Sequence, residues 1–289
     1  MSEQIMACID GSRFAELVCH YACWAGNELS APLTFLHVLD RERQAIDGSD
    51  HSGNIGLGAR EQLLSHLVSL DEQRAKVARE QGKLMLAAAV DLARADGVET
   101  VSSLQRHGEL VETLSELEQN VRLMVVGKRG EDAHPTSASG HLGSNLERVL
   151  RAVHRPVLIA TGDAFKAPKE IMFAFDNSAS TRKGIQKLAA SPLFRNARVH
   201  VVTVGVDSEA ARKGLPWVEQ VLSAADIRTT CAVREGDDIE SVLTRYVEDN
   251  AIDMTVMGAY GHSRIRHLLV GSTTTTMIQR TKIPLLVLR

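Results

Sequence analysis

A long internal repeat constrains this chain more than any other feature of its sequence. The pair Gly143-Ser144 recurs as Gly271-Ser272, 128 residues later. Pro156 recurs as Pro284 at the same offset, and an apolar run follows each proline. Two homologous units in tandem are therefore expected. The length of 289 residues agrees with this expectation, because it suits two domains of ordinary size.

The beginnings of the two units also match, but at a longer offset. Residues 5–10 mirror residues 171–176, which lie 166 positions further on, so the first unit holds about 38 additional residues between its second and third strands. This insertion reads as an extra loop and a long helix within residues 40–96. Residues 41–59 are polar and rich in glycine and serine, whereas residues 60–95 have a helical pattern with an apolar stripe. The helix either packs on the sheet or offers a surface for a partner or for self-association.

Short apolar segments alternate with helical segments in both units. The predicted strands are residues 4–9, 33–39, 99–105, 121–126 and 156–160, then 170–175, 197–204, 228–233, 252–257 and 284–288. The predicted helices are residues 13–29, 61–96, 109–119 and 144–153, then 179–190, 215–225, 237–250 and 272–281. Apolar strands joined by helices predict parallel sheets with right-handed crossovers. The fold class is α/β, with two doubly wound domains (1–163 and 168–289), each a five-stranded, mostly parallel sheet with helices on both faces.

A glycine pattern in the second unit marks a candidate binding site. Gly258 and Gly261 follow an apolar strand, and nine residues later Gly271-Ser272 begins a predicted helix. Glycines let the backbone approach an anion closely, and a helix start adds unpaired N–H donors and a positive dipole end. In open α/β sheets, ligands bind beyond the carboxyl ends of strands where the winding direction switches. We therefore expect Asp176 and Val204, which end the first two strands of this unit, to converge on the loop.

This pattern, Gly-x2-Gly-x9-Gly-Ser, resembles the nucleotide signature of ATP-binding members of the universal stress protein family. The resemblance covers nearly the whole chain except the insertion, and it implies domains like those of adenine nucleotide alpha hydrolases. It places the adenine against the backbone near Val204, with Asp176 close to the nucleoside. It places the phosphates against Gly258, Gly261, Gly271 and Ser272, with Thr273 close by.

The first unit departs from this signature. Gly127 and Gly130 supply the first pair of glycines, but twelve residues separate Gly130 from Gly143-Ser144. The intervening segment contains Glu131 and Asp132, whose negative charges would oppose an anion. Lys128, Arg129 and the counterparts of the second-unit residues are still suitably placed. The weaker candidates of this first site are Asp10, Val38, Gly127, Gly130, Gly143 and Ser144.

Each site residue also has a purely structural explanation. Asp176 can cap the helix that follows it, and the glycines can permit tight turns. Their joint occurrence favours a nucleotide site. The chain lacks the Gly-x4-Gly-Lys-[Ser/Thr] loop of P-loop NTPases. No catalytic triad or metal-ligand group can be recognised in the sequence.

The expected function is therefore nucleotide binding without rapid hydrolysis of the nucleotide. We expect a stress-response protein that binds an adenine nucleotide, ATP with or without Mg²⁺, chiefly in the second unit, as a regulatory module. No catalytic residue and no structural metal are assigned. Two alternatives stay open: a slow Mg-dependent ATP hydrolase and a scaffold that works without nucleotide.

Bulk properties limit the partners and the location. The formal net charge of −3 gives no electrostatic reason to expect binding to nucleic acid or to a membrane surface. No apolar run reaches the roughly 18–20 residues of a membrane span, and the first residues lack the features of a secretory signal, so a cytoplasmic location is expected. The four cysteines, with Cys19 and Cys23 four apart on a predicted helix, are interpreted as small buried hydrophobic residues.

The terminal strands of the two units suggest how the chain assembles. Residues 156–160 and 284–288 are short, apolar and at predicted sheet edges, where unpaired backbone groups are a liability. The family resemblance implies that these edges pair across a pseudo-twofold axis, so that one chain mimics a dimer of single-domain proteins. Further association into a homodimer and binding of a regulatory protein remain open.

Overall fold

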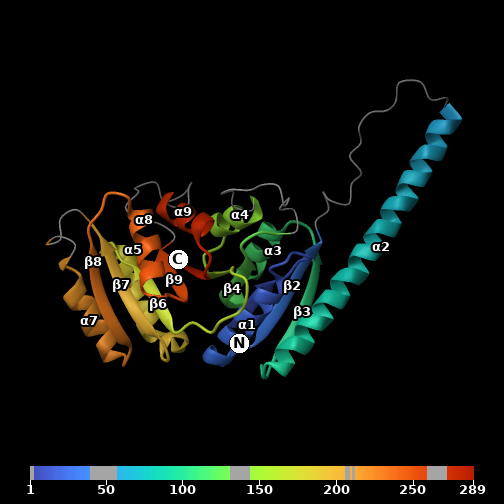
Figure 1. Cartoon of the computed structure of the whole chain (residues 1–289). Coiled ribbons are helices and arrows are strands. Elements are labelled where there is room, and N and C mark those ends of the chain that lie inside the picture. Colours follow the sequence, from blue (N-terminus) through green and yellow to red (C-terminus); the bar gives the residue numbers. More distant parts are fainter. Residues whose placement is uncertain (1–2, 40–56, 131–143, 206–208, 210–211, 259–271) are drawn as a thin grey trace.

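In a computed structural model of the chain, the described residues are 3–39, 57–130, 144–205, 209, 212–258 and 272–289. They form one continuous sheet with helices on both faces (Figure 1). Strands β1 to β5 belong to the first half of the chain and β6 to β10 to the second. The predicted alternation of strands and helices is present in both halves.

The elements of the first half are β1 (Gln4–Cys8), α1 (Ala15–Leu29), β2 (Leu33–Leu39), α2 (Leu57–Ala95), β3 (Val101–His107), α3 (Leu110–Leu117), the 3-10 helix η1 (Glu118–Asn120), β4 (Val121–Gly127), α4 (Ser144–Ala152) and β5 (Val157–Ala160). Those of the second half are β6 (Glu170–Ala174), α5 (Ala179–Ala190), the 3-10 helix η2 (Pro192–Phe194), β7 (Arg198–Val204), α7 (Leu215–Ala224), β8 (Arg228–Arg234), α8 (Ile239–Asp249), β9 (Met254–Gly258), α9 (Ser272–Arg280) and β10 (Leu285–Leu288).

The ten strands follow the order β3-β2-β1-β4-β5-β10-β9-β6-β7-β8. Every neighbouring pair is parallel except β5 and β10, which meet antiparallel in the middle with Leu286 opposite Leu158. The two predicted five-stranded sheets are therefore present, and they are fused into one. The predicted pairing of the terminal strands is what fuses them.

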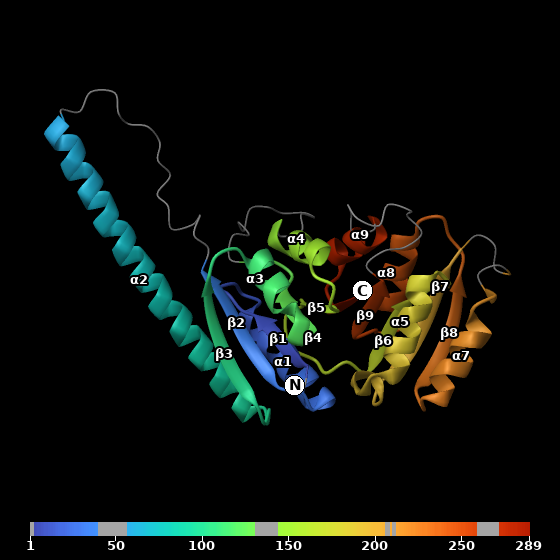
Figure 2. The same ribbon diagram turned by 180° about the vertical axis from the view of Figure 1, so that it is seen from behind.

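The helices form one layer on each face of this sheet. Helices α1, α5, α7 and the last part of α2 cover one face, and α3, α4, α8 and α9 cover the other (Figures 1 and 2). Successive residues of a central strand alternate between the layers: Ala7 of β1 packs with the first layer and Met6 with the second. Because both faces are covered, the inner strands are apolar throughout, which is why their sequences read as continuous hydrophobic runs.

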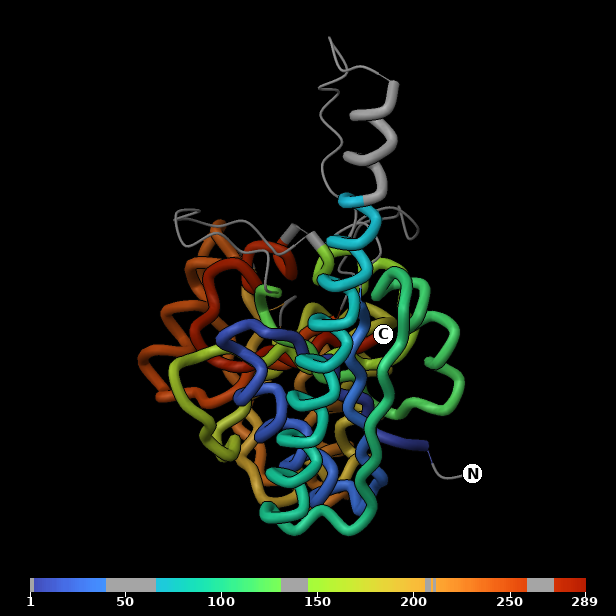
Figure 3. The backbone as a smooth tube through the Cα atoms, turned by 90° about the vertical axis from the view of Figure 1, so that its right-hand side faces the viewer, coloured from blue at the N-terminus to red at the C-terminus, as the bar shows by residue number. Residues whose placement is uncertain are grey.

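Helix α2 is longer than its packing requires. Its C-terminal part lies on β2 and β3 through buried Gly82, Leu86, Ala89 and Ala93. The N-terminal part of α2 extends past the sheet (Figures 1 and 3). Leu70 and Val77 of this helix are exposed. The prediction that this helix packs on the sheet is therefore confirmed for its C-terminal part alone. The predicted end of the loop at residue 59 is wrong, because the helix already begins at Leu57.

The cysteines are free thiols. Cys19 and Cys23 are buried on α1, whereas Cys8 and Cys231 are only half-buried. Burial, reinforced by nearby carboxylates, raises the pKa of each thiol to about 12. Thiols with such pKa values are poor nucleophiles at neutral pH. Across the described ranges, no helix combines the length and the apolar character needed to cross a bilayer, and no group of His, Cys, Asp and Glu has the makings of a metal site.

Candidate functional site

The register of three neighbouring strands brings the predicted second-half residues to within one residue of a common level. Ala174 of β6 pairs with Val202 of β7, so Asp176 and Val204 both lie two residues beyond that pair. Phe173 pairs with Val256 of β9, so Gly258 lies two residues beyond that pair. All three residues stand at the carboxyl edge of the sheet, where the winding switches between β6 and β9. This is the position at which open α/β sheets bind ligands.

Asp176 is held in place by the first turn of α5. Its Oδ1 accepts hydrogen bonds from the Ser178 N–H at 3.0 Å and from the Thr181 hydroxyl at 2.7 Å. Ser178 is the N-cap, and its Oγ accepts from the Thr181 N–H at 3.3 Å. The capping role that the sequence left open for Asp176 therefore belongs to Ser178, and Asp176 supports the cap through its bonds to Ser178 and Thr181. The same bonds fix the carboxylate at the strand end.

The first half repeats this arrangement. Asp10 follows β1, and its Oδ1 accepts from the Ser12 N–H at 3.0 Å, the same distance as in the second half. Cys8 pairs with Leu36, which puts Asp10 level with Val38. A Cβ added at Gly130 would lie 3.1 Å from Oδ2 of Asp10. The Gly127–Gly130 loop therefore approaches the carboxylate closely, which a glycine allows and a larger residue would hinder.

Helix α9 begins beside the end of β9. Thr274 is 3% exposed, and its hydroxyl donates to the main-chain oxygen of Gly258 at 3.0 Å. This bond holds the first turn of α9, which contains Ser272 and half-buried Thr273, against the carboxyl edge. The unpaired N–H groups of the helix start therefore lie at the same edge as Asp176. Sequence reasoning missed Thr274, although a run of four threonines at a predicted helix start is an unusual signal, because threonine is a weak helix former.

Several predicted residues lie outside the described part of the chain. Gly143, Gly261 and Gly271 are among them, and so are the side chains of Ser144 and Ser272. The loop residues 259–270 also fall there, as do Glu131 and Asp132.

Positive charges gather beside the first-half loop. The pKa of Lys128 falls to about 8 because the residue is half-buried and because Arg129 and Arg13 repel its charge. The guanidinium of Arg13 also lies over the Phe14 ring, 4.8 Å from its centroid. Positive charge is thus concentrated around Lys128.

The second half has a different set of polar groups beside its carboxylate. Asn177 has a positive φ of 59°, and its Oδ1 accepts from Nε of Arg182 at 2.8 Å. The guanidinium of Arg182 lies over the ring of Trp217 at 4.7 Å. No sequence pattern predicts this cluster, because its members come from two helices and the turn between β6 and α5.

Comparison with known proteins places these features in a family context. The family model described as "Universal stress protein family" matches residues 1–161 and again residues 168–289. A universal stress protein of Synechocystis sp. is 39% identical over 290 residues, which cover 99% of this chain and 100% of that protein. The crystal structure of a universal stress protein from Archaeoglobus fulgidus covers 100% of this chain and 99% of its own, with a TM-score of 0.71 and 18% identity. At that identity the likeness concerns the fold.

Proposed function

The chain belongs to the universal stress protein family, with two of its domains in tandem, and from this premise we propose that it binds an adenine nucleotide in its second domain. ATP is the nucleotide we propose, with or without Mg²⁺. The bound nucleotide would serve a regulatory role in a stress response, and turnover would be slow or absent.

One observation carries this proposal: three predicted contact residues lie within one residue of the same level at the carboxyl edge of the sheet. Val204 and Gly258 end β7 and β9, and Asp176 lies two residues after the end of β6, the strand between them. The start of α9 joins this group through the bond from Thr274 to Gly258. Their convergence therefore supports a common ligand more strongly than any one of them does alone.

The chemistry of these groups suits the parts of a nucleotide. A carboxylate such as Asp176 accepts hydrogen bonds, and ribose offers two neighbouring hydroxyl donors. The start of α9 and the glycines at the end of β9 suit the phosphates, because unpaired N–H groups and the helix dipole favour anions. The backbone at Val204 is left for the adenine. Each role follows the family signature read from the sequence.

The preference for the second domain rests on loop spacing. Nine residues separate Gly261 from Gly271, as the signature requires, but twelve separate Gly130 from Gly143. The first domain has the same Asp turn at Asp10, and its Gly130 lies close to the Asp10 carboxylate. We therefore propose it as a weaker or altered site.

Calorimetric titration with ATP tests the proposal through two matched substitutions. Gly261→Glu puts a bulky negative side chain in the second-domain loop, and Gly130→Glu does the same at the equivalent place in the first. We expect Gly261→Glu to weaken the main binding event at least about tenfold, equivalent to about 1.4 kcal/mol, and Gly130→Glu to leave it intact.

Two outcomes contradict the proposal. Equal ATP affinity in all three proteins would remove the site from the glycine loops, and loss in Gly130→Glu alone would move it to the first domain. Formation of ADP during the titration, in the wild type but not in Gly261→Glu, would favour the slow hydrolase over the binding module.

A further inference from the structure

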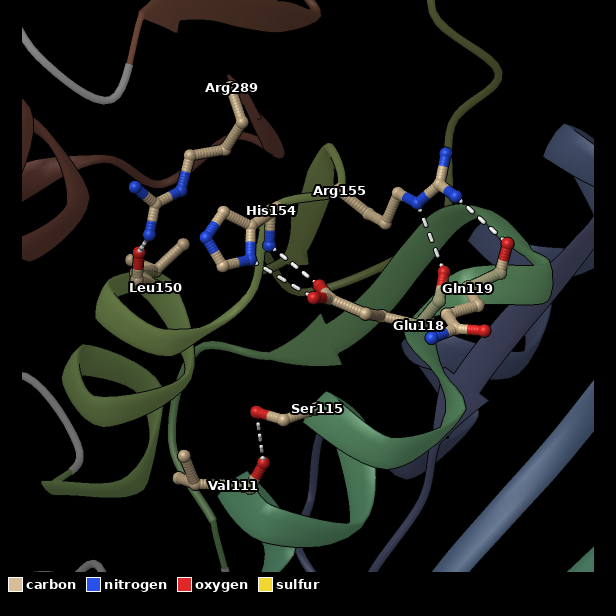
Figure 4. Close-up of polar contacts among 8 residues, drawn as sticks. All are labelled: Val111, Ser115, Glu118, Gln119, Leu150, His154, Arg155 and Arg289. Carbon is tan, nitrogen blue, oxygen red and sulfur yellow. Dashed lines mark hydrogen bonds and ion pairs between the residues drawn. The ribbon is translucent and has the colours of Figure 1, made fainter.

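Each domain caps the C-terminal end of a helix in the other domain. The ammonium of Lys128 donates to the main-chain oxygens of Gln279 at 2.9 Å and Thr281 at 2.7 Å, at the end of α9. In the opposite direction, the guanidinium of Arg289 donates to the main-chain oxygen of Leu150 in the last turn of α4 (Figure 4). The last carbonyls of a helix lack intrahelical donors and form the negative end of its dipole, so a cation there stabilises the helix.

These two helices are the ones that the candidate sites use. Helix α4 begins at Ser144 and α9 at Ser272, the serines of the two glycine signatures. The end that would face a phosphate is thus built by one domain, and the opposite end is held by the other. Each helix has only nine residues, so a displacement at one end is passed to the other end with little room for bending.

Lys128 links its own domain rigidly to α9. The residue follows Gly127 directly, and its N–H donates to the main-chain oxygen of Ala160 at the end of β5, at 3.0 Å. Its backbone is therefore fixed to the first domain while its side chain holds the second. The nearby charges of Arg129 and Arg13 repel the ammonium, and the carbonyls of α9 supply the negative partners that it needs.

The two caps are not copies of each other. Within the repeat, Ala259 occupies the position of Lys128, and Thr161 occupies the position of Arg289. Neither counterpart is a cation. Each domain therefore supplies its cap from a different position, which ties the arrangement to the tandem chain and not to the repeated unit.

The end of α4 has additional support from within its own domain. The N–H of His154 donates to Oε2 of Glu118 at 2.7 Å, and Nε of Arg155 donates to the Glu118 main-chain oxygen at 3.0 Å (Figure 4). At the end of α9, the corresponding bond is local, from the Thr281 hydroxyl to the main-chain oxygen of Ile283 at 2.8 Å. Loss of the cap should therefore matter more for α9 than for α4.

We propose that Lys128 is a positioning residue for the second-domain site: from the glycine loop of the first domain, it fixes α9 and so the helix start that meets the ligand. The second site then depends on the first domain, although the sequence placed Lys128 with the first site. The link to nucleotide binding rests on the proposed function, but the positioning of α9 does not.

Hydrogen exchange of the ligand-free full chain tests the positioning directly. Lys128→Met removes the donor and keeps much of the side chain, and we expect exchange in the last turn of α9 to become roughly two- to tenfold faster, the range expected for a charge at a helix C-terminus. Helix α4 should be unaffected. Arg289→Leu should give the reverse pattern with a smaller effect, and Lys128→Arg should restore slow exchange in α9. Unchanged exchange of α9 in Lys128→Met would overturn the proposal.

ATP titration of the same proteins tests the consequence for the site. Lys128→Met should weaken ATP binding roughly two- to tenfold without changing its stoichiometry, whereas Lys183→Met, at an exposed lysine of α5, should not. Equal affinity of Lys128→Met and the wild type would overturn the role in binding. If the wild type binds no ATP at all, the proposed function fails, and the exchange pattern alone decides whether Lys128 positions α9.

Discussion

Asp253 joins the start of β9 to the segment that connects the two domains. The residue is 8% exposed, and its Oδ2 accepts from the N–H groups of Lys169 at 3.0 Å and Glu170 at 3.1 Å. Its Oδ1 accepts from the Lys166 ammonium. Burial acts to raise the pKa of Asp253, but these donors more than offset it, so the pKa lies below its usual value. The charged carboxylate is thus the form that the fold stabilises.

The sign of this pKa shift sets the pH dependence of Asp253→Asn. A carboxyl group with a lowered folded-state pKa stabilises the protein above its unfolded pKa of about 3.9, and this contribution is lost as the pH falls through the folded value. We expect Asp253→Asn to lower the free energy of unfolding by roughly 1–3 kcal/mol at pH 7, with the deficit shrinking below about pH 4. Urea unfolding at several pH values measures this. Asp249→Asn, at an exposed position of α8, is the control, and a deficit as large at low pH as at pH 7 would contradict the account.

The success of single-residue predictions depended on whether the residue makes its contacts close to the end of its own strand. The place of Asp176 and Val204 at the carboxyl edge could be predicted, because the ends of parallel strands lie at a known edge of the sheet. Lys128 was not assigned its role, because that role depends on a contact with a distant segment: Lys128 is 151 residues from Gln279. Spacing along the chain carries no information about such a contact.

At the scale of elements, the packing of α2 depends on one glycine. Gly82 is buried where the helix crosses the sheet, and a Cβ added there would lie 2.6 Å from Cδ2 of His37 and in contact with the Gln105 amide. His37 cannot move away easily, since its Nδ1 is within 2.9 Å of the Ile9 main-chain oxygen in the buried interior. The close approach of α2 to β2 and β3 therefore requires a residue without a side chain.

A pair of substitutions on α2 measures this requirement. Gly82→Val should lower the free energy of unfolding by about 1–3 kcal/mol through overpacking, whereas Gln81→Val, one residue away on the exposed side, should change it by no more than about 0.5 kcal/mol. Both variants place the same β-branched side chain on α2, so a larger loss of stability at position 82 reports the contact with the sheet. Chemical denaturation supplies both values, and equal effects at the two positions would mean that α2 does not pack as described.

Element bounds were predicted well where the hydrophobic pattern itself changes, and less well elsewhere. Helix α5 has the predicted bounds, 179–190. Strand β3 was predicted at 99–105 but spans Val101–His107, because its ladder with β2 continues to the pair Leu39 and His107. The polar end of an edge strand contains no apolar residues that would mark it in the sequence. Its last residue is therefore set by hydrogen bonding to the neighbouring strand, and the hydrophobic pattern cannot predict it.

At the scale of the whole molecule, the two domains share one sheet through β5 and β10. Leu285, Leu286 and Val287 pair with Ile159, Leu158 and Val157. The repeat in the sequence predicted two units, and the family resemblance predicted that their edges meet. The caps formed by Lys128 and Arg289 could not be predicted, because they follow from how the two units pack and have no counterpart in the repeat.

Separation of the domains should expose the edge of β10. A fragment of residues 166–289 retains Asp253 and Lys166 but lacks β5. We expect it to dimerise through β10, because an apolar edge strand with unpaired backbone groups pairs readily with a second copy. Analytical ultracentrifugation measures its mass, with the full chain at the same concentration as the reference in which β10 is already paired. A folded fragment that stays monomeric would argue against this account of the shared sheet.

The most direct test of the central claim is the nucleotide that the chain retains. Purified wild type and Gly261→Glu are incubated with ATP and Mg²⁺, desalted and denatured, and the released adenine nucleotides are counted per chain. A stoichiometric amount of ATP from the wild type and little from Gly261→Glu is the predicted result. Equal amounts from both proteins, or none from the wild type, would contradict a nucleotide site in the second domain.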